Sequence, residues 1–249
     1  MENFLSTTLI YGLYLLIGII IVKLIINPFR RMSASNDIPD LDYIVDNVGY
    51  GIKENDELEI IPIRTLQETN SGSDIIPDKF KAVDIRECDN VFLKIPEQIE
   101  NHKVTSIGKR GLHRCEKTCY ITLPSTIRQI KEEAFAECFE LHELHIPDGV
   151  TSIGDSAFRN CISLENITLG SGLKKLGSCV FADCSSLSEI HCKGLPPKVG
   201  AYTFTDKIMN SCKLYVKAEY IERYKKASDW KHFKNILTEP VGGINLVRT

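Results

Sequence analysis

The sequence predicts a repeat solenoid, β-rich with short helical turns, in which units of 23 residues stack from about Val104 to Phe204. Three rows of apolar residues predict this fold. Bulky side chains recur every 23 positions at Leu112, Phe135, Phe158, Phe181 and Phe204. Cysteines follow three positions later at Cys115, Cys138, Cys161 and Cys184. Aliphatic residues recur at the same interval at Ile121, Leu144, Ile167 and Ile190.

Three further rows keep this interval. They are Ile107, Ile130, Ile153, Leu176 and Val199; Thr118, Leu141, Leu164 and Leu187; and Leu123, Ile146, Leu169 and Cys192. One such unit cannot bury its own apolar side, so units stack and the rows form a continuous core. A period of about 20–29 residues with aliphatic ladders is typical of leucine-rich repeats.

Each unit is expected to contain one strand and one short helical turn. Leu144 and Ile146 are two residues apart, so both point inward on a strand, while Glu143 and His145 point outward. The segment Ala134–Cys138 has the spacing of a helical turn with Phe135 as its buried plug.

The cysteines favour packing over a disulfide framework. The chain has nine, and an odd number cannot pair completely within one chain. The cysteine row predicts stacked, buried, reduced thiols that act as small apolar fillers. Cys119 lies in the turn and is expected to be exposed.

The N-terminal segment predicts a membrane anchor. No charged residue occurs from Asn3 to Val22, and residues 4–26 are long enough to span a bilayer core of about 30 Å as one helix. A cleavable signal peptide would need a basic start and a small-residue cleavage site, and a buried core helix is rarely apolar all round. Residues 1–31 are therefore taken as the anchor with its basic flank.

Residues 32–90 are predicted to be a linker and an N-terminal capping segment. The stretch Arg31–Asp40 is polar and contains a proline. Eight acidic residues and only Lys53 lie between Asp37 and Glu59, which is typical of a solvated surface. A strand is expected within Asp56–Ile63, and some β-structure here would cover the first repeat.

The repeat residues resemble a known family. Val150–Cys161 (VTSIGDSAFRNC) and Leu164–Leu169 (LENITL) are similar to BspA-like leucine-rich repeats, which occur in surface and secreted proteins of host-associated bacteria. The resemblance extends from about Phe92 to Ile236, so 91–212 is assigned to the solenoid and 213–249 to a cap and tail. It implies adhesion or protein binding, a location outside the cytoplasm, and no catalytic residues.

The tail is expected to form a helical cap over the last repeat. Leu214–Val216 and Tyr220–Ile236 are similar to the terminal cap of such arrays. The end of a solenoid exposes an apolar unit that must be covered. The side chains expected to cover it are Tyr220, Tyr224, Trp230 and Phe233, with Lys225, Lys226 and Lys231 left in solvent.

The outward strand positions are the candidate binding surface. They are Tyr120, Thr122, Glu143, His145, Asn166, Thr168, Glu189 and His191. Four strands at a spacing of about 4.8 Å would make a surface about 15–20 Å long, enough for a peptide or a small protein contact. The competing interpretation is that these are simply solvated strand residues.

No sequence motif predicts a metal site, a cofactor or catalysis. The segment His142–His145 (HELH) lacks the HExxH spacing of zinc proteases, and its two histidines are expected to face different ways. There is no glycine-rich phosphate loop and no GxSxG elbow. A net charge of −3 lacks the basic excess expected for a nucleic-acid partner.

The sequence thus predicts a single-pass membrane protein whose leucine-rich repeats bind a protein or peptide without catalysis. The alternatives are a structural spacer or envelope component with no specific ligand, and an enzyme with unrecognised chemistry in residues 37–81. The side of the membrane stays open. Lys23, Arg30 and Arg31 follow the apolar run and favour repeats in the cytoplasm, whereas the family resemblance implies the opposite side.

Overall fold

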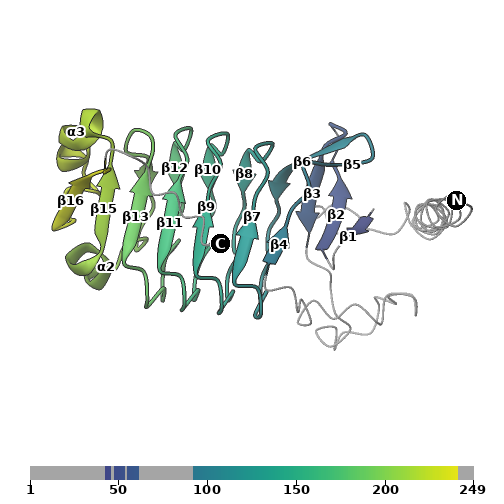
Figure 1. The fold of residues 1–249 in the computed structure, drawn as a ribbon, viewed down its shortest axis with the longest axis horizontal. Helices are drawn as coiled ribbons and strands as arrows, with labels where there is room; N and C mark the ends of the chain where they lie inside the picture. Colours follow the sequence, from purple (N-terminus) through teal and green to yellow (C-terminus); the bar gives the residue numbers. More distant parts are fainter. Residues whose placement is uncertain (1–42, 46–47, 54, 62–91, 241–249) are drawn as a thin grey trace, which may run out of the picture.

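The computed structural model describes residues 43–45, 48–53, 55–61 and 92–240. In these residues two sheets run along the long axis and face each other across a common core (Figure 1). The predicted membrane span, residues 4–26, lies outside the described residues. Among those described, no helix has the length and apolar character needed to cross a membrane.

The first sheet contains the candidate surface and is called sheet B. Its strand order is β16-β15-β13-β11-β9-β7-β4. The strands are β4 (Phe92–Lys94), β7 (Tyr120–Thr122), β9 (Glu143–His145), β11 (Asn166–Leu169), β13 (Glu189–Cys192), β15 (Lys213–Val216) and β16 (Asn235–Thr238). Every pairing within it is parallel, because each turn of the solenoid places its strand beside the previous one and in the same direction.

The second sheet, called sheet A, closes the opposite side of the core. Its order is β1-β2-β3-β6-β8-β10-β12-β14, and β5 also pairs with β6. The strands are β1 (Tyr43–Val45), β2 (Val48–Ile52), β3 (Leu58–Ile61), β5 (Gln98–Ile99), β6 (His102–Ile107), β8 (Gln129–Ile130), β10 (Ser152–Ile153), β12 (Lys175–Leu176) and β14 (Lys198–Val199).

The expected β-structure before the repeats is present. β2 pairs antiparallel with β1 and β3, and β3 then pairs parallel with β6. The side chains of Leu58 and Ile60 are fully buried, so this hairpin covers the apolar end of the first repeat.

The repeat register places equivalent residues side by side. Asn166 pairs with Glu189 and Ile153 with Leu176, and the members of each pair are 23 positions apart. Phe135, Phe158 and Phe181 are 0% exposed, and their rings stack with centroids 5.1 and 5.8 Å apart. The predicted aromatic row is therefore the centre of the core.

The predicted short helical turns are instead irregular turns. Cys138 N–H donates to the Phe135 carbonyl at 3.3 Å, but Glu133 and Glu137 on either side have φ of 53° and 62°. Phe135 N–H donates to the Ala157 carbonyl of the next repeat at 2.8 Å. The turn does not continue as a helix because left-handed residues interrupt it and its amides bond across repeats.

The cap is less helical than expected. It contains α2 (Asp206–Ser211), the 3-10 turn η4 (Ala218–Tyr220) and α3 (Ile221–Lys226), but also the sheet strands β15 and β16. Figure 1 shows these elements together at one end of the solenoid. Trp230 is fully buried, and its ring lies 4.9 Å from Phe204 of the last repeat.

Candidate functional site

The outward face of sheet B carries two rows of side chains. The leading row is the first residue of each strand: Phe92, Tyr120, Glu143, Asn166, Glu189, Lys213 and Asn235. The trailing row lies two residues later: Lys94, Thr122, His145, Thr168, His191, Tyr215 and Leu237. All eight residues of the candidate surface belong to these rows. The register pairs Tyr120 with Glu143 and Thr168 with His191, so the rows are continuous across strands.

Seven of the eight predicted residues keep a solvent-accessible surface. Thr122 and His145 are exposed, and Tyr120, Glu143, Asn166, Thr168 and Glu189 are partly exposed.

His191 differs from the other seven because only 9% of it is exposed. Its ring stacks on Tyr215 with centroids 4.7 Å apart, and its Nδ1 lies 2.9 Å from the Glu239 carboxylate. The chain after β16 therefore covers His191, which makes it part of the capped end of the face.

An aromatic group occupies the other end of sheet B. Phe92 is 72% exposed, and its ring stacks on Tyr120 at 5.1 Å with an interplanar angle of 11°. Tyr120 in turn lies 6.2 Å from the His142 ring. Phe92 was not among the predicted surface residues because it pairs with Tyr120 across 28 positions, outside the 23-residue spacing. The sequence Phe92-Leu-Lys-Ile95 alternates outward and inward residues as Glu143-Leu-His-Ile146 does, and could have identified this strand.

Charge is divided between the two rows. Glu143 in the leading row and Glu165 beside it form no ion pair within the described residues, whereas Glu189 pairs with Lys213 at 3.0 Å. In the trailing row His145 Nε2 lies 3.4 Å from the Lys193 ammonium group. The leading row thus carries a carboxylate without a cation beside Tyr120, while at its far end Lys213 is paired with Glu189.

The face has no arrangement for metal binding in the described residues. His142 and His145 face different groups: His142 Nδ1 lies 2.6 Å from the Glu140 carbonyl oxygen, and His145 contacts Lys193.

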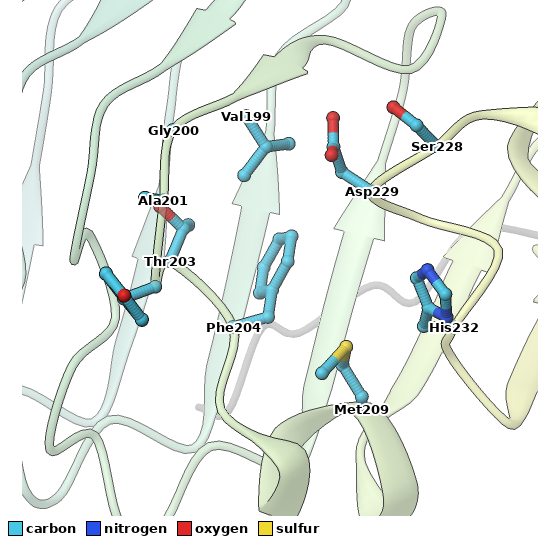
Figure 2. A pocket seen from close by; sticks show the side chains of 10 residues that line it. Val199, Gly200, Ala201, Thr203, Phe204, Met209, Ser228, Asp229 and His232 are labelled. Atoms are coloured by element: carbon cyan, nitrogen blue, oxygen red, sulfur yellow. The ribbon is translucent and has the colours of Figure 1, made fainter.

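A separate hollow of about 250 Å³ lies where the cap meets the last repeat turn. Figure 2 shows Ser228, Asp229 and His232 of the cap opposite the Val199–Phe204 segment. None of the predicted surface residues lines it.

Two sheets whose repeat strands are parallel and are joined by short turns define a leucine-rich-repeat solenoid. A sequence model of the BspA type leucine rich repeat region matches residues 93–225 in six copies. The chain therefore belongs to the BspA-type leucine-rich-repeat family. No curated relative matches the chain.

A solved structure supports this fold. A leucine-rich-repeat protein of T. pallidum superposes with a TM-score of 0.53 and 22% identity, over 73% of this chain and 71% of that one. The pneumococcal vaccine antigen PcpA gives a TM-score of 0.47 and 23% identity, over 61% of this chain and 42% of that one. A leucine-rich cell surface protein of Faecalibacterium prausnitzii gives a TM-score of 0.40 and 25% identity, over 59% of this chain and 38% of that one. The chain thus spans less than half of the last two.

Proposed function

We propose that this chain is a membrane-tethered interaction module that binds a partner protein through the outward face of sheet B and carries out no catalysis. The observation that supports it is the pair of continuous rows that run across all seven strands of that sheet. At about 4.8 Å per strand, six strand spacings extend about 29 Å. A face of this length suits a protein or peptide better than a small metabolite, which binds in a concave pocket.

The side chains of the face support this proposal. Asn166 and Thr168 lie at its centre and offer hydrogen-bonding groups, while Tyr120 and Phe92 offer apolar surface. Aromatic anchors beside polar groups are typical of protein interfaces.

The tether is proposed from the uncharged run at residues 4–26. The basic residues after it favour repeats in the cytoplasm, whereas family membership favours the outside. A reporter fused after Thr249 that is active on only one side of the membrane decides between these positions. Release of the full-length chain by alkaline carbonate would contradict the tether.

Capture of a partner by the detergent-solubilised full chain tests the binding function. We expect one saturable partner whose recovery falls at least about tenfold for Asn166→Arg, since a bulky charge at the centre of an interface disrupts its packing. The matched control is Gln129→Arg, at an exposed position of β8 in sheet A. A structural spacer would give no saturable partner, or recovery that Asn166→Arg leaves unchanged.

A further inference from the structure

A strip at the exposed end of sheet B combines stacked aromatic rings with carboxylates. This acidic–aromatic strip consists of Phe92, Tyr120, His142, Glu143 and Glu165. We propose that it binds an extended, arginine-bearing segment of the partner protein. This inference rests on the proposed binding function and specifies the chemistry of the partner.

The aromatic half of the strip offers an open ring face. Phe92 belongs to the end strand β4, and nearly three-quarters of its surface is exposed although it stacks on Tyr120. Its exposed ring offers apolar surface and a π face that a partner can cover. An arginine guanidinium is planar and weakly hydrated, so it stacks on such rings and gains cation–π attraction.

The acidic half of the strip lies directly beside the rings. Glu143 is the register partner of Tyr120. Glu165 is held on the next repeat, where its N–H donates to the His142 carbonyl at 2.8 Å. Tyr120 lies between the Phe92 and His142 rings, so a guanidinium that pairs with Glu143 lies beside this stack, and a second arginine of the extended segment stacks on the open face of Phe92.

Some carboxylates of the solenoid are already paired with a cation of the same chain. Glu132 pairs with Lys109 at 3.0 Å, and Glu137 lies 3.5 Å from Arg114. Glu143 and Glu165 have no cation within 4 Å in the part of the chain that the structure describes, so a cation from a partner would complete them.

The basic groups of the face fix where that cation binds. Lys94 lies in the trailing row of β4, and Lys193 lies beside His145. These ammonium groups repel a guanidinium from the trailing row and leave the leading row as its site. A negatively charged peptide would be repelled by the carboxylates of the strip.

Peptide titration against the full chain in detergent tests the inference. The probes are a fluorescent peptide of alternating threonine and arginine, and one with citrulline in place of each arginine, which keeps the shape and removes the charge. We expect the arginine peptide to bind about tenfold tighter at low ionic strength, or about 1.4 kcal/mol, with the difference shrinking in salt.

Variants locate the effect. Glu143→Gln combined with Glu165→Gln should remove the preference for arginine over citrulline. Phe92→Ala should weaken binding of the arginine peptide about two- to fivefold, as loss of an exposed cation–π contact predicts. The matched control combines Glu219→Gln with Glu222→Gln, two exposed cap carboxylates, and should leave the preference unchanged.

The outcomes separate this inference from the proposed function. Equal binding of both peptides, lost on Asn166→Arg, would overturn the arginine preference and leave the binding face intact. Failure of both peptides to bind would overturn the inference, whereas a partner captured by the full chain and lost on Asn166→Arg would still support the proposed function. An arginine preference that survives the double glutamine change would place the site elsewhere and contradict it.

Discussion

The Lys131 ammonium group lies 2.6 Å from Oε2 and 2.8 Å from Oε1 of Glu59, a carboxylate that is 1% exposed and 72 positions earlier in the chain. Ser106 donates to the same carboxylate at 3.0 Å. Gly108 makes the room, because a Cβ there would lie 2.4 Å from Glu59 Oε1. The contact joins the N-terminal hairpin to the repeats and closes that end of the core.

Removing the cation from this pair should loosen the hairpin. Lys131→Met leaves the buried Glu59 carboxylate with Ser106 as its remaining side-chain hydrogen-bond donor among the described residues. The loss of a fully buried partner costs about 3–5 kcal/mol, and we expect about 1–3 kcal/mol because Lys131 is 40% exposed. Urea unfolding measures the change. The double variant Glu59→Gln with Lys131→Met should regain part of it, and no regain would contradict a role for the pair.

The aromatic row should dominate the stability of the repeats. Phe158→Ala removes a fully buried ring stacked between Phe135 and Phe181, and should cost about 3–5 kcal/mol in the free energy of unfolding. Phe92→Ala is the matched control, because its ring is 72% exposed. We expect that control to cost less than about 1 kcal/mol. Equal effects for the two variants would contradict the packing described above.

The repeats were predictable from sequence because every turn of the solenoid restates the same burial pattern. Leu144 and Ile146 are buried and His145 is exposed, as strand alternation requires. The two ends of the candidate surface could not be predicted in this way, because they depart from the repeat. Phe92 lies outside the interval, and His191 is covered by Glu239, a contact between a repeat and the tail that no periodicity encodes. The prediction of helical turns was wrong because Glu133 and Glu137 adopt left-handed backbone conformations. Such conformations are expected of glycine, so the sequence did not indicate them.

The cysteine row should label slowly in the folded protein. Cys138, Cys161 and Cys184 are free and buried, and the Cys138 thiol donates to the Leu112 carbonyl at 3.1 Å. Burial raises the pKa of Cys138, which lowers the fraction of reactive thiolate. Cys119 was expected to be exposed and is partly buried, so it should react faster than the row but not at the rate of an unfolded thiol.

Mass mapping after timed alkylation gives the order of reaction, with unfolded protein as the reference. Labelling of Cys161 as fast as Cys119, or a mapped disulfide between two cysteines of the row, would contradict the burial of that row.

His113 should make the solenoid less stable in mild acid. Burial is the largest cause that lowers the pKa of His113. Of the charges around it, Arg110 and Arg114 lower this pKa further, while Glu137 and Glu133 raise it. The unfolded chain, with a histidine pKa of about 6.5, therefore takes up the proton first, and the free energy of unfolding decreases as the pH falls through that value. The decrease ends below the folded pKa.

His113→Gln should reduce this loss of stability between neutral pH and about pH 5, a window set by the ordinary histidine pKa. Urea unfolding at several pH values measures it, and His232→Gln at an exposed position of the cap is the control. A variant that loses as much stability as the original protein in this window would show that another group is responsible.

Photo-crosslinking in intact cells tests the central claim most directly, which is that the outward face of sheet B binds a partner protein. A photoreactive residue is placed in the full chain at Thr168, in the trailing row, or at Ser152, an equally half-buried position in sheet A. The account predicts one discrete adduct from Thr168 and none from Ser152. An adduct from Ser152 but not from Thr168, or no adduct from any leading-row or trailing-row position, would contradict it.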